Sequence, residues 1–211
     1  AIEESRKATT GHERLKAEVY HVRLCVQAIA NVLHGKFPNR DITVIVNYDT
    51  RFLSERYAAE AAKVLSHNRI RVLLAERDSP TQAQACQIIR RGAQGGINFT
   101  ASFNPPEYNG LKFNLETGAP ALPSETDKIE EDAARLIRCA SACAYYPRTE
   151  FVEKIDLQAD YLDYIRKKID FGAIQKAGLR IAVDPLYGTS REDLDEMLEE
   201  NGIAVEEVHA Y

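Results

Sequence analysis

Ser102 is the side chain of this sequence best placed to do chemistry, because it lies in a stiff loop, Thr-Ala-Ser-Phe-Asn-Pro-Pro, at residues 100–106. The small Ala101 lets the backbone bend tightly, and Pro105 and Pro106 restrict the chain that follows. Most serines in turns only shape the turn. No Gly-x-Ser-x-Gly elbow surrounds this one and no histidine lies close in sequence to act as its base, so a hydrolase nucleophile is the least favoured interpretation.

Three further polar residues could act together with this serine. Lys112 follows Ser102 by ten residues, and by residue type alone it is a solvated lysine at the end of a strand. Asp49 and Arg51 lie in a polar turn before a helix and could do no more than shape that turn. If they share an edge with Ser102, Arg51 could steady either the loop or a phosphate group bound there, and the first role is favoured.

Alternating strand and helix patterns determine where these residues lie. Nearly all-apolar, β-branched runs are typical of strands covered on both faces, and apolar residues at helical intervals separate them. This alternation predicts a mainly parallel sheet, which binds ligands at the carboxyl ends of its strands. Asp49, Arg51 and Ser102 all follow strands, so we expect them at one edge. The expected strands are residues 42–46, 70–75 and 97–99, and the expected helices are residues 15–33, 54–67 with Ser54 as the cap, 81–94 and 125–144.

The same plan restarts after residue 147. Residues 156–170 and a segment from a Ser190 cap to residue 202 have helical patterns, and residues 179–183 and 203–208 have strand patterns. The predicted fold class is therefore α/β, with a three-layer α/β/α unit around a mixed, mainly parallel sheet. We expect that unit in residues 1–150, followed in residues 151–211 by a linker helix and an incomplete second domain of the same kind. The chain thus looks truncated relative to the architecture that it begins.

Composition narrows the possible functional classes. The 211 residues are 45% hydrophobic and 28% charged, and a net charge of −5 without a basic run argues against nucleic acid as a partner. No apolar stretch approaches the roughly 18 residues of a membrane span, and the N-terminus lacks the order of a signal peptide, so we expect a cytoplasmic protein without membrane association. The four cysteines and five histidines have no zinc-site spacing, which predicts reduced thiols.

The serine loop resembles the active-site loop of the alpha-D-phosphohexomutase superfamily, which contains phosphoglucomutases and phosphomannomutases. The usual family form is Thr-Ala-Ser-His-Asn-Pro followed by an Asn-Gly-x-Lys element. Residues 48–51, 54–57, 118–121 and 183–188 also resemble family segments, so the similarity extends over approximately residues 20–211. In the loop itself the matching residues are Thr100, Ala101, Ser102, Asn104, Pro105, Asn109, Gly110 and Lys112.

The resemblance implies a phosphohexomutase that acts by intramolecular phosphoryl transfer on hexose phosphates. It implies that Ser102 carries a phosphoryl group, gives it to the sugar and retrieves one from the other end of the bisphosphate. It also implies that Lys112 assists proton transfer, that a glucose 1,6-bisphosphate-type activator is used, and that Mg²⁺ binds Ser102 through its phosphate. The residues expected to support the substrate or the loop are Asp49, Arg51, Thr100, Asn104 and Asn109.

The sequence departs from the family pattern in several places. Phe103 replaces the histidine that normally follows the phosphoserine, and a phenylalanine cannot exchange protons or bind a phosphate by hydrogen bonds. The family's N-terminal arginine motif has only a distant counterpart, so Arg14 has no assigned role, and Gln82 stands where a Thr-Pro pair usually opens the third helix. The family's metal loop and its two sugar- and phosphate-recognition loops are not in this chain. We therefore do not expect these residues alone to run the full mutase cycle.

Two functional hypotheses follow from these observations. The first is a phosphohexomutase whose phosphoserine domain and the start of a second domain are present here. The second is a non-catalytic relative that serves as a binding or regulatory module and associates with itself through the apolar face of an incomplete second domain.

Overall fold

The structure is a computed structural model that describes the backbone of residues 11–139 and 145–209, and the side chains within those ranges from residue 18 onward. In these ranges the strands form a five-stranded sheet with the order β4-β3-β1-β2-β5 and a separate two-stranded sheet. All neighbours in the large sheet are parallel except β3 and β4, which confirms the predicted mixed, mainly parallel arrangement. Its strands are β1 (Thr43–Tyr48), β2 (Arg71–Ala75), β3 (Gly95–Phe99), β4 (Leu111–Leu115) and β5 (Val152–Ile155).

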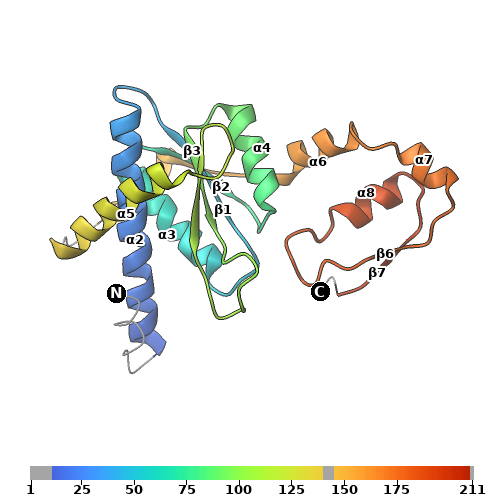
Figure 1. Ribbon diagram of the computed structural model, residues 1–211, viewed down its shortest axis with the longest axis horizontal. Coiled ribbons are helices and arrows are strands. Elements are labelled where there is room, and N and C mark those ends of the chain that lie inside the picture. Colours follow the sequence, from blue (N-terminus) through green and yellow to red (C-terminus); the bar gives the residue numbers. More distant parts are fainter. Residues whose placement is uncertain (1–10, 140–144, 210–211) are drawn as a thin grey trace.

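Helices cover both faces of the large sheet and complete three layers (Figure 1). On one face α3 (Ser54–His67) lies against the strands, and α2 (Gly11–Lys36) packs on α3 and on α5 (Pro123–Arg138). On the other face α4 (Thr81–Arg91) lies against β1 and β3, and α6 (Gln158–Arg166) packs on α4. The three-layer α/β/α prediction is therefore confirmed.

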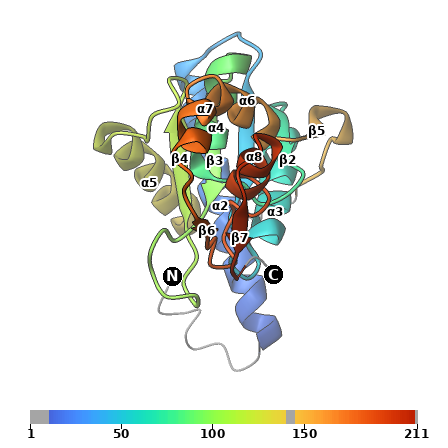
Figure 2. The same ribbon diagram turned by 90° about the vertical axis from the view of Figure 1, so that its right-hand side faces the viewer.

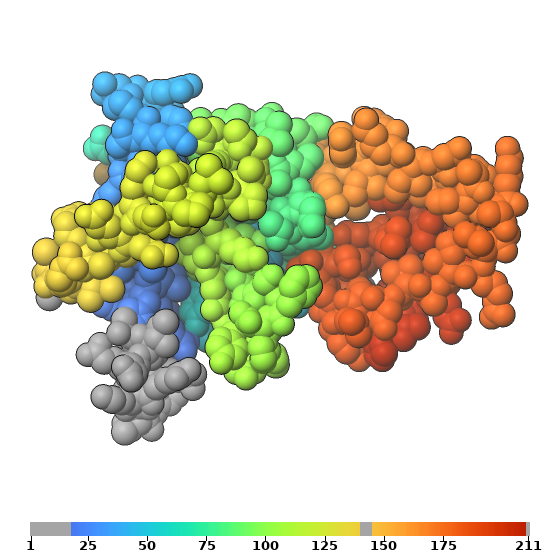
Figure 3. Space-filling view, viewed as in Figure 1, coloured from blue at the N-terminus to red at the C-terminus, as the bar shows by residue number. Residues whose placement is uncertain are grey.

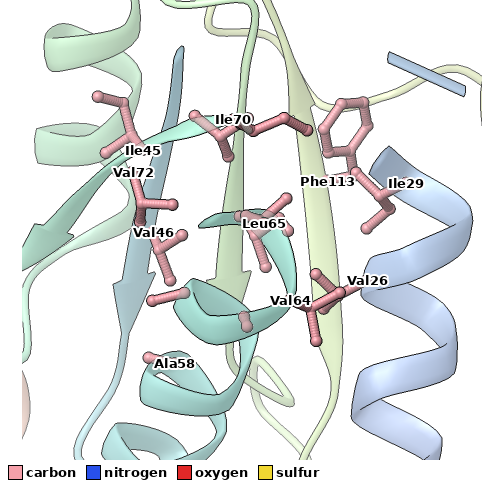
Figure 4. Close-up of a cluster of buried hydrophobic side chains, with 14 of the residues drawn as sticks. Val26, Ile29, Ile45, Val46, Ala58, Val64, Leu65, Ile70, Val72 and Phe113 are labelled. Atoms are coloured by element: carbon pink, nitrogen blue, oxygen red, sulfur yellow. The ribbon is translucent and has the colours of Figure 1, made fainter. Parts of the chain in front are cut away.

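The core lies between the sheet and its two helical layers. Figure 4 shows apolar side chains of α2 and α3, among them Val26 and Leu65, gathered with side chains of the strands such as Ile45. β1 and β3 are buried along almost their whole length, as expected for central strands that are covered on both faces. A Cβ atom at Gly96 would lie 2.7 Å from Ile88 Cδ1, so any larger residue would force this side chain of α4 to shift.

The structure corrects several predicted helix boundaries. Ser54 is the first residue of α3 and not its cap; Leu53 occupies the cap position with a left-handed φ of 67°, and no side chain caps the helix. The third helix ends at Arg91 because Gly92 adopts a left-handed φ of 61°. α5 begins at Pro123 and ends at Arg138, and the part of its predicted range at residues 140–144 lies outside the described residues.

Two strands of the large sheet were not predicted from the sequence. β4 forms a hairpin-like antiparallel pair with β3, and β5 adds the outer strand beside β2. β5 begins just after a single 3₁₀ turn at Thr149–Phe151. The predicted domain boundary after residue 150 stays a prediction, but β5, which that boundary assigned to the second domain, pairs within the first sheet.

The second unit is small and faces the viewer in Figure 2. Its two strands, β6 (Ile181–Val183) and β7 (Val205–Glu207), are parallel and are connected through α8 (Leu194–Glu200). The predicted helix at residues 156–170 is shorter than expected and consists of α6, which ends at Arg166. A separate helix that was not predicted, α7 (Phe171–Lys176), follows it, and the Asp170 carboxylate caps α7 by accepting a hydrogen bond from Ala173 N. The helix expected to begin at Ser190 begins instead at Leu194. The buried cluster of this unit consists of Val183, Leu198 and Ile203.

Two further observations bear on the sequence-based predictions. No helix within the described residues is both long and apolar enough to cross a membrane. Among the described cysteines, Cys25, Cys86 and Cys139 are free thiols, and Cys143 lies outside the described residues.

Candidate functional site

The serine loop leaves the carboxyl end of β3 next to the carboxyl end of β1. Asp49 N donates a hydrogen bond to Phe99 O at 3.0 Å, so the segments that follow the two strands begin side by side. In Figure 3 the loop between β3 and β4 forms the yellow-green projection at the lower edge of the molecule. The structure therefore brings together the two strand-end motifs that the sequence predicted at one edge.

Ser102 occupies a left-handed backbone conformation in this loop. Its φ is 57°, a value that residues with a side chain adopt infrequently, and the residue is exposed. The Ser102 amide donates to Thr100 Oγ1 at 3.0 Å, and Asn104 N donates to Ala101 O at 3.1 Å. These bonds give the serine a defined position in a sharp turn, and Thr100 supports that turn through its side chain.

The Arg51 guanidinium holds the whole serine loop. Its two terminal nitrogens each donate to two backbone carbonyls, so all four of their N–H groups have acceptors in the loop, and Nε lies 3.3 Å from Asp49 Oδ2 in an ion pair. Only 13% of the Arg51 side chain is exposed. Its donors are thus committed to the loop and not to an external anion. The carbonyl acceptors belong to Ser102 at 2.8 Å, Asn104 at 2.7 Å, Pro105 at 2.8 Å and Tyr108 at 3.0 Å.

The return of the loop to the sheet is held by a second set of contacts. Asn109 Nδ2 donates to Ser54 Oγ at 2.9 Å, and Asn109 Oδ1 accepts from Gly110 N at 2.8 Å. Thr100 N donates to Gly110 O at 3.0 Å, which closes the base of the loop. A Cβ atom at Gly110 would lie 3.0 Å from Thr100 O, so a glycine suits this close approach. The role of Ser54 was not predicted, since a serine at the start of a helix is ordinarily read as its cap.

Lys112 lies in β4 directly after this return. It stands opposite Asn98 in the β3–β4 pair and is exposed. Its side chain forms no hydrogen bond or ion pair with any residue in the described ranges. Lys112 therefore follows the serine loop closely in the chain while its ammonium group is not committed to another side chain, as is required of a group that is to meet a ligand.

Three aromatic residues near the carboxyl ends of β1 and β3 differ in how exposed their side chains are. Phe103, next to Ser102, and Phe52, in the turn after β1, are 103% and 83% exposed. Tyr48, at the end of β1, is buried, and burial together with the nearby carboxylates of Glu55 and Asp78 raises the pKa of its phenol to about 12. Tyr48 therefore stays protonated at neutral pH and is not a candidate base.

The described residues do not make up a magnesium site at this edge. Among the described side chains, no three His, Cys, Asp or Glu residues lie close enough together to hold a metal ion. The carboxylate of Asp49, in the neighbouring turn, is already occupied: Oδ1 accepts from Arg51 N at 3.0 Å and from Ser54 Oγ at 2.9 Å, and Oδ2 lies 3.3 Å from Arg51 Nε. A groove of about 350 Å³ between α2 and α5 is lined by none of the site residues.

Comparison with a family model and with curated proteins finds similarity to the phosphoglucomutase/phosphomannomutase family in each case. Residues 6–137 match the family model of phosphoglucomutase/phosphomannomutase, alpha/beta/alpha domain I. A phosphoglucomutase of Staphylococcus saprophyticus is 30% identical over 125 residues, which are 59% of this chain and 22% of the relative. A phosphoglucomutase of Staphylococcus aureus (strain USA300) is 29% identical over 168 residues, which are 74% of this chain and 29% of the relative. The chain thus spans less than a third of these curated relatives.

Solved structures show the same similarity. A Thermus thermophilus protein described as a phosphomannomutase superimposes with a TM-score of 0.78 at 26% identity, over 89% of this chain and 41% of that protein. The Paramecium phosphoglucomutase pp63/parafusin superimposes with a TM-score of 0.71 at 21% identity, over 90% of this chain and 40% of that protein. The second similarity concerns the fold alone.

Proposed function

Because the chain belongs to the phosphoglucomutase/phosphomannomutase family of isomerases, we propose that Ser102 carries a phosphoryl group and exchanges it with hexose phosphates. One observation above all supports this proposal: Ser102 is exposed in a left-handed turn whose surrounding carbonyls are held by a single, largely enclosed arginine. Phosphoryl transfer needs accurate positioning and neutralisation of charge more than it needs a strong base. A rigid, exposed hydroxyl without a histidine partner suits that chemistry better than it suits hydrolysis.

The proposed step is a simple exchange of bonds. Ser102 Oγ attacks a phosphorus atom of a hexose bisphosphate, a new O–P bond forms at the serine, and the P–O bond to the sugar breaks. The proton of the serine hydroxyl passes to the departing sugar oxygen, and Lys112 is proposed to assist that transfer. In the reverse direction the phosphoserine gives its phosphoryl group to a hexose monophosphate. Arg51, with Asp49, Thr100, Asn104 and Asn109, would keep the loop in place throughout.

The expected ligands and location are part of the same proposal. They are hexose phosphates and a glucose 1,6-bisphosphate-type activator in the cytoplasm, with Mg²⁺ as the cofactor expected of the family. From this chain, the phosphate on Ser102 would supply the metal's ligand, since the described residues do not complete a magnesium site. We propose, further, that residues 1–150 form the phosphoserine domain, and that residues 151–211 are a linker helix and an incomplete second domain, apart from β5, which pairs within the first sheet.

The direct test is the phosphorylation of Ser102. The chain is incubated with glucose 1,6-bisphosphate, with and without Mg²⁺ and with and without a fragment that carries the remaining domains of a family member, and its intact mass is then measured. We expect the mass to increase by one phosphoryl group when that fragment is supplied. The same mixture is assayed for conversion of glucose 1-phosphate to glucose 6-phosphate.

Two variants make this result specific. Ser102→Ala should abolish the mass increase, whereas Ser190→Ala, which removes another exposed serine in a loop, should leave it unchanged. An unmodified Ser102 under all four conditions would contradict the proposal.

A second candidate function is a non-catalytic binding or regulatory module. The observation that favours it is Phe103, a fully exposed aromatic side chain directly beside the serine. Further exposed apolar side chains, Leu179 and Leu186, lie in the second unit. This candidate predicts self-association, which light scattering measures as a mass that rises with protein concentration. A monomer at all concentrations would argue against it.

A further inference from the structure

Ser54 links the turn after β1 to the far end of the serine loop. It is fully buried, and its hydroxyl donates to Asp49 Oδ1 at 2.9 Å while accepting from Asn109 Nδ2 at 2.9 Å. A hydroxyl is the smallest uncharged group that can donate and accept at the same time. Ser54 is free for this use because the cap position of α3 is taken by Leu53 and no side chain caps the helix.

The two residues bonded to the Ser54 hydroxyl, Asp49 and Asn109, connect it to different parts of the serine loop. Through Asp49, whose Oδ2 faces Arg51 Nε at 3.3 Å, the contacts continue to the carbonyl of Ser102. Through Asn109, whose Oδ1 accepts from Gly110 N, they continue into β4, the strand of Lys112. Besides Arg51, which donates to Ser102 O and Tyr108 O, Ser54 is therefore a second side chain that connects the Ser102 side of the loop with its return toward Lys112.

We propose that Ser54 is a positioning residue that sets where Ser102 stands relative to Lys112, an inference that rests on the proposed phosphoryl transfer. Removing the hydroxyl does not strip either partner of all its contacts. Asp49 Oδ1 still accepts from Arg51 N at 3.0 Å, and Asn109 Nδ2 still lies 3.3 Å from Phe52 O. Loss of Ser54 Oγ should thus loosen the return of the loop without unfolding the domain, and it should affect the rate of transfer more than the binding of substrate.

The chain offers a closely matched control for this test. Ser66 lies in the same helix and is equally buried, and its hydroxyl also both donates, to Lys63 O at 3.1 Å, and accepts, from Arg148 N at 3.3 Å. The two substitutions Ser54→Ala and Ser66→Ala remove the same atoms from the same helix. They differ in which loop the lost hydroxyl contacted.

The first measurement is amide hydrogen exchange in residues 100–110, where several backbone amides donate within the loop. We expect Ser54→Ala to speed exchange there by about tenfold and Ser66→Ala to leave it unchanged. Asn109→Ala should produce the same pattern as Ser54→Ala, and the double variant should be no looser than Asn109→Ala alone. Unchanged exchange in Ser54→Ala would overturn the inference. So would a double variant in which the effects of Ser54→Ala and Asn109→Ala simply add.

The second measurement is the single-turnover rate at which glucose 1,6-bisphosphate phosphorylates Ser102, with the remaining domains supplied. Ser54→Ala should lower the maximal rate by about tenfold and change the half-saturating concentration by less than about twofold. An unchanged maximal rate would overturn the inference. If the unsubstituted chain is never phosphorylated, the proposed function fails, while hydrogen exchange still decides whether Ser54 positions the loop. Should Ser54→Ala not fold, Asn109→Ala, in the loop itself, supplies both measurements.

Discussion

Arg51 and Arg77 each hold two parts of the molecule together, but they do so with different partners. Arg51 is almost enclosed and donates to four backbone carbonyls within the first unit. Arg77 is 40% exposed and lies in the segment after β2, where it contacts Gln158 of α6 and reaches the second unit through Glu192 and the carbonyl of Arg191. Carbonyl groups do not titrate, whereas the acidic partners of Arg77 do.

Asp193 makes the junction around Arg77 sensitive to pH. Its side chain is 8% exposed and both oxygens accept from Gln158 Nε2 at 2.9 Å, while the Arg77 guanidinium lies at 3.5 Å. Burial raises the pKa of Asp193 to about 6; Arg77 and Gln158 oppose this shift, and Asp195 and Asp156 add to it. The arginine that holds the loop bearing Ser102 thus donates to carbonyls, which do not titrate, whereas the junction of the two units contains a carboxyl group whose pKa lies near neutrality.

The largest effect is expected for Arg51→Ala. Four loop carbonyls would lose their donors and turn to water, so we expect phosphorylation of Ser102 to slow by about 100-fold and the free energy of unfolding to fall by about 2 kcal/mol. Arg51→Lys should recover little of the phosphorylation rate or of the stability, because an ammonium group cannot supply the planar set of donors. Arg77→Ala is the matched control at the junction and should change the phosphorylation rate by less than about twofold. Equal effects of Arg51→Ala and Arg77→Ala on that rate would remove the distinction between the two regions.

The next effect is the dependence of stability on pH at the junction. A carboxyl group whose pKa is raised in the folded state binds its proton more tightly there than in the unfolded chain, so its contribution to stability decreases as pH rises. For Asp193 this loss runs from its ordinary value of 3.8 to about 6. Between about pH 4.5 and about pH 7 it amounts to about 2 kcal/mol.

Urea unfolding of the unsubstituted chain and of Asp193→Asn at these two pH values measures the contribution. Other carboxyls contribute in the opposite sense, since contacts with Lys63 and Arg23 lower the pKa of Glu60 despite its burial, so the difference between the two proteins is the informative quantity. The free energy of unfolding of the unsubstituted chain, relative to that of Asp193→Asn, should be higher at the lower pH than at the higher pH. A difference that does not change with pH, or that changes in the other direction, would contradict this account of the junction.

Sequence patterns predicted the central strands and the shared edge, and failed where partners are distant in sequence. The β-branched run of β1 identified a buried strand, and because Ser102 and Arg51 both follow strands, their proximity could be inferred. β5 is short and exposes Glu153 and Lys154, as the outer strand of a sheet can. Its sequence therefore lacks the run of buried apolar residues from which a strand is recognised. The role of Ser54 depends on a contact with Asn109, 55 residues later, which no local pattern reveals.

The smallest effect on stability is expected for Phe103, which belongs to the serine loop but not to the contacts that hold it. Its side chain is fully exposed, so Phe103→Ala should change the free energy of unfolding by less than about 0.5 kcal/mol. Phe103→His should be equally harmless to stability, yet it places a group that titrates near pH 6.5 beside Ser102. The rate of Ser102 phosphorylation should then acquire a pH dependence between about pH 5.5 and about pH 7.5 that the unsubstituted chain lacks. Identical pH profiles for the two proteins would show that residue 103 does not meet the reacting phosphate, whereas a large loss of stability in Phe103→Ala would show that this side chain helps to hold the loop after all.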